Sequence, residues 1–364
     1  MYEITLVKSR KEWRQFLDVQ RRIQKAHSHA VPLPEFEVQR LLDTDANPAL
    51  RGRQLFLLVV RRGDTPVGRC SLLLPRNREK RTAILGFFEC IDDARAAQLL
   101  FNEAEFLATT AGTTCIHGPF SPTTSGVTGV QLDRFDDPNV LSEACSPPWY
   151  AAQFKAAGFE IERYGRTWLN PSLQGTLESL AARLPDRTGR FRIRTVGMRD
   201  LAAGISDLAA IFESAFSANW GRDSMSVDDY LFTARFLLPA WQPGSFALVY
   251  DDTRPAGALI SFPDINPAFR GIRSRVRPLA LWNARRRARR SRSLVTFAMG
   301  LHPDYQNTAA GLMLARHMTE YGRRFDRMYS SWITEGNAAS ERIATRFGLR
   351  PWRRFAVYRK DIPQ

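Results

Sequence analysis

The chain has 364 residues, which is enough for two or three domains at roughly 150 residues each. Hydrophobic residues make up 44% of the chain and charged residues 24%, as in ordinary globular proteins. The longest apolar runs, such as 55–60, fall far short of the ~18 residues that span a bilayer. We therefore expect a cytoplasmic protein with no membrane partner.

The sulfur and imidazole side chains give no sign of a metal site. The four cysteines form no CxxC pair, and the five histidines have no zinc-ligand spacing. We expect free thiols, mostly buried in strands, and no bound metal.

The first half begins its regular pattern with a predicted β-hairpin. Residues 55–74 read as two apolar strands joined by a turn at Gly63 and Asp64. A third strand is predicted over 83–89, followed by an amphipathic helix that begins near Asp92 or Asp93. Glu89, Asp92 and Asp93 would place three carboxylates at this helix N-terminus, where they would repel a phosphate.

The second half repeats this order. A hairpin is predicted over 246–262, a strand over 294–301, a helix through 314–325 and a strand over 328–333. Each half then ends with a short helix, a glycine and a final strand, at Gly158 and Gly348. The repeat predicts two similar domains, at 1–170 and 191–364, joined by a linker at 171–190 that contains Pro171, Pro185 and Gly189.

A strongly basic segment interrupts the second half. It carries much of the net charge of +15 and contains no acidic residue. Its arginines are Arg270, Arg273, Arg275, Arg277, Arg285, Arg286, Arg287, Arg289, Arg290 and Arg292. Such a block is typical of a surface that binds phosphates, nucleic acid or a membrane, and equally of a solvated helix face. Helical turns are predicted over 284–290.

One stretch of the second half resembles a known cofactor-binding signature. The segment LHPDYQNTAAGLML at 301–314 resembles the phosphate-binding loop of the GNAT N-acetyltransferase superfamily. Other stretches, including FDDP at 135–138, PPWY at 147–150 and SWITEGN at 331–337, are similar to a family of bacterial tandem-GNAT proteins. The resemblance implies a mixed-sheet α/β fold of two tandem GNAT-like domains, of which the first is degenerate.

The resemblance also implies that acetyl-CoA or another acyl-CoA binds the second domain. In such a loop, backbone N–H groups at a helix N-terminus point at the pyrophosphate, and small residues let it approach. The residues expected at the cofactor are Gly300, Leu301, Gln306, Ala309, Ala310, Gly311 and Asn337. Asn337 is also a good helix N-cap, which is the alternative interpretation of this residue.

Acyl transfer to an amine needs a base and a group that stabilises the oxyanion. The strand at 294–301 has no carboxylate, and Ala344 stands where the superfamily often has a tyrosine. The remaining catalytic candidates are Glu335, Ser331, Asn337 and His302. Glu335 also fits an exposed loop acid, Ser331 a core hydroxyl and His302 an ordinary residue at the end of a strand. Trp220, Trp332 and Trp149 are candidates for the acceptor pocket or for the core.

These features lead to one main functional hypothesis and two alternatives. The first is a GNAT-type acyltransferase that moves an acyl group from acyl-CoA to an amine of a small-molecule acceptor. The second is a transferase similar to the Fem-like enzymes, which take an aminoacyl group from tRNA. That reaction would use tRNA or another polyanion bound through Arg285, Arg286, Arg287, Arg289 and Arg290. The third is a GNAT that binds a ligand without catalysis.

Overall fold

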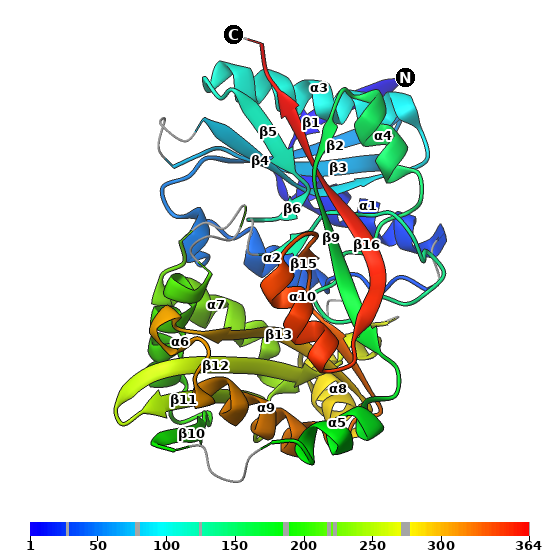
Figure 1. Cartoon of the computed structure of the whole chain (residues 1–364). Coiled ribbons are helices and arrows are strands. Elements are labelled where there is room, and N and C mark those ends of the chain that lie inside the picture. The colour runs from blue at the N-terminus through cyan, green and yellow to red at the C-terminus, as the bar shows by residue number, and fades with distance from the viewer. Residues whose placement is uncertain are drawn as a thin grey trace. The chain divides into compact units, whose positions relative to one another are not determined.

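The computed structural model describes residues 1–26, 29–76, 81–123, 126–184, 189–216, 220, 224–270 and 277–363. The chain divides into two compact units (Figure 1). The first unit comprises residues 1–165 and 353–363, and the second unit comprises residues 166–270 and 277–352. Two long strands, β9 (Glu160–Asn170) and β16 (Arg350–Asp361), have residues in both units.

The first unit is a mixed sheet between helices, with strand order β1-β2-β3-β4-β5-β16. Its other strands are β1 (Tyr2–Leu6), β2 (Leu55–Arg62), β3 (Thr65–Leu73), β4 (Thr82–Cys90) and β5 (Cys115–Gly118). Its helices are α1 (Arg10–Ala26), α2 (Glu35–Leu41), α3 (Ala94–Thr110) and α4 (Tyr150–Ala156). A 3-10 turn, η1 (Pro48–Leu50), precedes β2, and the short strands β6 (Phe120–Ser121), β7 (Val127–Thr128) and β8 (Val130–Gln131) follow β5.

The second unit repeats this topology, with strand order β10-β11-β12-β13-β14-β9. Its other strands are β10 (Phe191–Thr195), β11 (Phe246–Asp251), β12 (Arg254–Pro263), β13 (Ser293–Leu301), β14 (Arg327–Ser330) and β15 (Ile333–Thr334). Its helices are α5 (Leu173–Ala181), α6 (Leu201–Ala215), α7 (Val227–Leu237), α8 (Arg277–Arg290), α9 (Ala309–Gly322) and α10 (Ala338–Arg346). The 3-10 turns are η2 (Leu238–Ala240), η3 (Asn266–Phe269) and η4 (Pro303–Tyr305).

Strand direction repeats as well as strand order. The pairs β4–β5 and β13–β14 are parallel, whereas the hairpins β2–β3 and β11–β12 are antiparallel. The predicted order of hairpin, strand, helix and strand is therefore confirmed in both halves, and the mixed α/β fold with it.

The final strands are exchanged between the halves, which corrects the expectation that each half closes with its own strand. In β9, Leu169 and Asn170 pair with β14 of the second unit. In β16, residues 358–361 pair with β5 of the first unit. A strand's own sequence shows its alternation but not its partner, because pairing depends on residues distant along the chain. The domain boundaries 1–170 and 191–364 stay a prediction.

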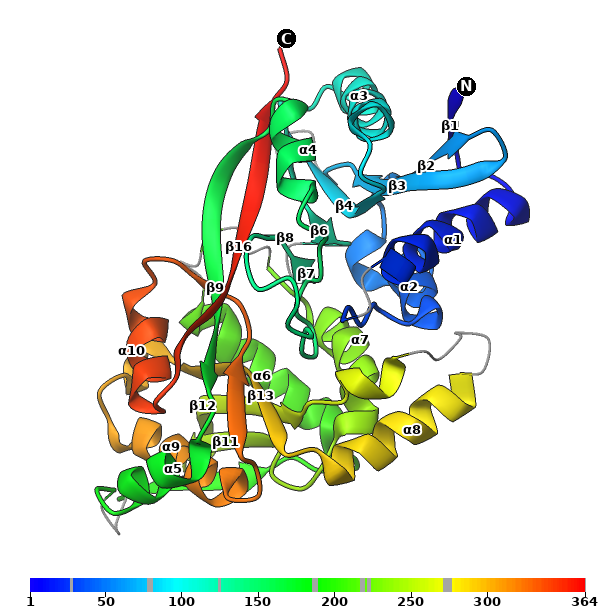
Figure 2. The same cartoon turned by 90° about the vertical axis from the view of Figure 1, so that its right-hand side faces the viewer.

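Period-two alternation in the strands places helices on both faces of each sheet. In β2, Leu58 and Val60 belong to the hydrophobic core that contains α3, while Val59 belongs to the core that contains Phe16 of α1. Figure 2 shows α3 and α1 on opposite faces of this sheet. In β11, Val249 packs in the cluster that contains α5, α9 and α10, while the neighbouring strand residue 248 packs against α6.

Part of the predicted linker is core structure. Helix α5 lies within 171–190, and its Leu173 and Leu177 are buried in the second unit. Asn170 donates its side-chain N–H to the carbonyl of Phe347 at 2.9 Å, which ties β9 to the end of α10. Pro185, expected in the linker, lies outside the described residues.

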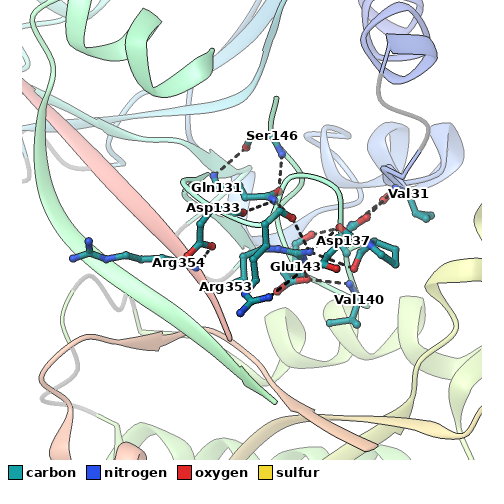
Figure 3. Close-up of polar contacts among 12 residues, drawn as sticks. Val31, Gln131, Asp133, Asp137, Val140, Glu143, Ser146, Arg353 and Arg354 are labelled. Atoms are coloured by element: carbon teal, nitrogen blue, oxygen red, sulfur yellow. Dashed lines mark hydrogen bonds and ion pairs between the residues drawn. The ribbon is translucent and has the colours of Figure 1, made fainter. Parts of the chain in front are cut away.

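A buried arginine organises the loop that carries the FDDP stretch (Figure 3). Arg353 of β16 is fully buried and forms an ion pair with Glu143. It also donates to the carbonyl of Asp137 at 2.7 Å. The Glu143 carboxylate in turn accepts from the backbone N–H of Val140 at 3.1 Å. The motif at 135–138 is thus held by polar contacts within the first unit.

Candidate functional site

The candidate site of the second unit begins where two strands separate. Strand β13 pairs with β14 only as far as Thr296 and Ser330, whereas it pairs with β12 as far as Leu301. Among the described residues, no other strand pairs with this edge of β13 beyond Thr296. The segment 297–301 therefore has backbone groups on one edge that a bound molecule can meet.

A β-bulge lies at the point of separation. The register between β12 and β13 shifts so that Ile260 faces Ala298 while Ser261 faces Thr296, which leaves Phe297 as the extra residue. A bulge kinks the strand and redirects its N–H and carbonyl groups. Ser331 holds the bulge, because its hydroxyl donates to the carbonyl of Phe297 at 2.6 Å.

The loop from β13 to α9 is held by a buried side chain and by local hydrogen bonds. After His302 it forms the turn η4, whose Tyr305 is buried in the core of the second unit. Asn307 has a φ of 63°, and Thr308 then caps α9 by accepting from the N–H of Ala310 at 3.3 Å. The cap is a neutral hydroxyl, so the positive end of the helix dipole is not compensated by a carboxylate.

The small residues of this helix start lie in different places, and Ala310 is fully buried in the core of the second unit. A Cβ added to Gly311 would meet only one flexible side-chain atom, of Leu301, at 3.3 Å. This contact shows that the end of β13 and the first turn of α9 lie side by side, as the predicted cofactor residues require. Ala309 and Gly311 are half-buried. A helix N-terminus of this kind is a general place for an anion to bind, because its backbone N–H groups and its dipole both favour negative charge.

The corresponding place in the first unit is filled by the chain itself. The bulge of β4 includes Phe87, whose N–H donates to the hydroxyl of Ser121 in β6 at 3.3 Å. A Cβ on Gly86 would come within 1.9 Å of the carbonyl oxygen of Phe120. Strand β6 therefore lies along an edge of β4. The equivalent edge of β13 has no described strand beside it.

The acidic junction of the first unit is only partly as predicted. Asp93 caps α3 by accepting from the N–H groups of Arg95 and Ala96, each at 3.0 Å. Asp92 is exposed. Glu89 does not lie at the helix terminus, because it is the second-last residue of β4. Its carboxylate lies 3.0 Å from the guanidinium of Arg69, and burial raises the pKa of this carboxyl group. One capping carboxylate, not three, occupies this helix terminus.

The predicted catalytic residues lie near the split strands but in different settings. Glu335 follows β15, is about a third exposed and forms an ion pair with Arg166 of β9 at 2.8 Å. Asn337 caps α10 by accepting from the N–H of Ser340 at 3.1 Å. His302 accepts from the N–H of Asp304 at 3.3 Å through its ring nitrogen.

The three tryptophans have different environments. Trp149 packs in the core of the first unit and donates its indole N–H to the carbonyl of Cys90 at 2.9 Å. Trp332 lies between β14 and β15, and its buried indole N–H has no partner among the described residues. Trp220 is half-buried, in a stretch whose neighbours on both sides lie outside the described residues.

Two polar residues of this region carried no signal in the sequence. Arg166, the partner of Glu335, lies 169 positions away in the chain. Ser330 accepts from the N–H of Trp168 at 3.0 Å and so ties β14 to β9. Both contacts depend on the exchange of β9, so that no pattern within the second half could have indicated them.

Two other kinds of feature are absent from the described residues. No group of three or more His, Cys, Asp or Glu side chains could hold a metal ion. No helix combines the length and the apolar character needed to cross a membrane.

Comparison with known proteins places this geometry in a fold class. A tandem GNAT protein from the clavulanic acid biosynthesis pathway superimposes with a TM-score of 0.59 at 15% identity, over 100% of this chain and 99% of that chain. The chain thus has the fold of the tandem GNAT proteins, as the sequence resemblance predicts.

Two relatives extend the comparison at the level of sequence. Protein YghO of Escherichia coli (strain K12) is 25% identical over 78% of this chain and 75% of its own length. The bacterial ceramide synthase of Caulobacter vibrioides (strain NA1000 / CB15N) is 22% identical over 98% of this chain and 96% of its own length. No protein-family model matches the chain.

Proposed function

We propose that this protein is an N-acyltransferase that transfers an acyl group from acyl-CoA to an amine. The observation that carries the proposal is the edge of β13 at 297–301 that pairs with no described strand, followed by a loop that ends at the neutral cap of α9. This edge supplies N–H donors for the thioester carbonyl, and the first turn of α9 receives the pyrophosphate. The tandem GNAT fold supports the same arrangement.

The reaction forms an amide bond and releases a thiol. The free amine attacks the thioester carbonyl carbon, and the C–S bond breaks to leave the CoA thiolate. We assign Glu335 as the acceptor of the amine proton, because it is a carboxylate at the end of the split strands and is held in place by Arg166. Ser331 is a positioning residue, since its hydroxyl holds the bulge at Phe297.

For the acceptor, we propose an amine that carries a long apolar chain as the first class to test. The Caulobacter relative, which matches nearly the whole chain, is named as a ceramide synthase. A ceramide is an amide formed between a fatty acyl group and a long-chain amino alcohol. Such a product requires the same bond formation that the site at β13 supports.

The test is a transfer assay on the full chain with CoA thioesters of several chain lengths and with short and long-chain amines. Free thiol and amide product are measured by absorbance and mass spectrometry. We expect Glu335→Gln to keep CoA binding but to lower turnover roughly 10²- to 10⁴-fold, as the loss of a general base does. Gly311→Asp should instead weaken CoA binding at least about tenfold by placing a charge beside the pyrophosphate.

The same assay decides between the alternatives. Transfer from aminoacyl-tRNA but from no CoA thioester would replace the proposal with the tRNA-dependent reaction. Tight binding of a CoA thioester with no product from any amine would identify a ligand-binding protein without catalysis.

A further inference from the structure

Helix α8 has two distinct faces, and one of them packs against the rest of the second unit. Its buried residues are Ala280, Ala284 and Ala288, which follow one another at helical spacing. This alanine face packs against the 3-10 turns η2 and η3 of the second unit. The other side chains of the helix are exposed, apart from Leu281 and Asn283, which are half-buried.

The outward face carries large apolar side chains in its first half. Leu279 and Trp282 are each 57% exposed, which makes them the most exposed large apolar residues among the described part of the second unit. They are three positions apart and therefore project from the same side of the helix. Core packing does not account for either residue.

The second half of the helix carries positive charge. All five arginines at 285, 286, 287, 289 and 290 are exposed, and α8 contains no acidic residue. Within the described residues none of the five forms an ion pair. Arg286 lies over the ring of Trp282 at 5.6 Å, so that the charged and apolar parts meet on one surface.

This combination matches the physical demands of an anionic lipid surface. Tryptophan prefers the boundary between headgroups and acyl chains, and a leucine beside it gains from leaving water. Arginines on an interfacial helix attract anionic headgroups, and this attraction weakens as salt increases. A phosphate backbone of nucleic acid would engage the arginines but would leave Leu279 exposed.

We propose that α8 is a docking helix for the surface of an anionic lipid bilayer. Leu279 and Trp282 enter the headgroup boundary, and the arginines at 285–290 bind the headgroup phosphates. The helix lies on the membrane and does not cross it. The proposal does not depend on the acyl-transfer reaction, since it concerns only where the protein binds.

The experiment is cosedimentation of the full chain with phosphatidylcholine vesicles that contain or lack phosphatidylglycerol. We expect binding only to the anionic vesicles, and weaker binding as salt increases. The triple variant Arg285→Gln, Arg286→Gln, Arg289→Gln should weaken it roughly 10- to 100-fold. The double variant Leu279→Ala, Trp282→Ala should weaken it roughly tenfold or more.

Matched controls separate the helix from overall charge and hydrophobicity. Arg183, Arg192 and Arg199 are exposed arginines elsewhere in the second unit, and their change to Gln removes the same three charges. Met198 and Val227 are exposed apolar residues that serve as the control for Leu279 and Trp282. Both control variants should bind anionic vesicles as the wild type does.

Three outcomes would overturn the proposal. The first is unchanged vesicle binding by the Leu279→Ala, Trp282→Ala variant, because lipid insertion would then play no part. The second is tighter binding to unacylated tRNA than to anionic vesicles, lost in the arginine variant, which would identify a nucleic-acid surface. The third is no binding to either partner, which would identify α8 as a solvated face.

Discussion

At the scale of single residues, the structure explains why charged side chains occur in buried places. Arg353 is fully buried, yet it faces the carboxylate of Glu143 and the carbonyl oxygens of Asp137 and Pro138. A buried charge is tolerated only when it is paired and hydrogen-bonded. The FDDP stretch therefore contributes backbone acceptors that fix the loop to β16.

Removing one partner of this pair should destabilise the first unit strongly. We expect Arg353→Met to lower the free energy of unfolding by about 3–5 kcal/mol, because the Glu143 charge stays buried without a partner. Denaturant unfolding followed by circular dichroism measures the change. Adding Glu143→Gln should recover part of the loss. Arg359→Met on the same strand breaks only an exposed ion pair and should cost less than about 1 kcal/mol.

At the scale of secondary-structure elements, helices α3 and α9 are counterparts with different N-terminal chemistry. Both follow the bulged strand of their unit and precede the strand that runs parallel to it. Asp93 caps α3 with a carboxylate, whereas Thr308 caps α9 with a hydroxyl. The negative cap offsets the dipole of α3, so that only α9 offers an uncompensated positive end to an anion.

The cap of α3 should make the stability of the first unit depend on pH. Desolvation acts to raise the pKa of Asp93, but hydrogen bonds from Tyr2 and from two backbone N–H groups outweigh it and lower that pKa. The stabilisation is thus present above the unfolded-state pKa of about 3.9 and is lost as the pH falls through the folded-state value.

Variants at this cap separate charge from hydrogen bonding. Asp93→Ala should cost about 1 kcal/mol of unfolding free energy at neutral pH. Asp93→Asn keeps a capping acceptor and should retain much of the stability while losing the acid dependence. Asp92→Ala, at the exposed neighbour, should change neither. Thermal unfolding between pH 3 and pH 7 provides the measurement, and equal behaviour of Asp92 and Asp93 variants would contradict the assignment.

At the scale of the whole molecule, two similar units should yield a single CoA site. Strand β6 fills the edge of β4 in the first unit, while the edge of β13 stays unpaired beyond Thr296. We expect isothermal titration to give one CoA per chain. Gly311→Asp should remove that site, whereas Ala94→Asp, which puts the same charge at the start of α3, should leave it intact. Two sites per chain would contradict the inference.

The order of elements could be read from the sequence because it depends on local chemistry. Alternating apolar residues predicted the hairpins β2–β3 and β11–β12, and the helices α3 and α9 followed from helical spacing. The loop at 301–311 was found because small residues and a proline stand at fixed intervals before a helix. The helical part of the basic segment was predicted from 284–290, and the structure extends it to residue 277.

The repeat, the position of the signature-like loop and the lack of a carboxylate on β13 all follow from the order of residues alone. Strand pairing does not, because it joins residues far apart in the chain: β9 pairs in the second unit and β16 in the first. Because β9 and β16 are exchanged, Arg166 of β9 forms an ion pair with Glu335, and Arg353 of β16 forms one with Glu143. The position of β6 along the edge of β4 could not be predicted either, because a two-residue strand is too short to show a periodic pattern in the sequence.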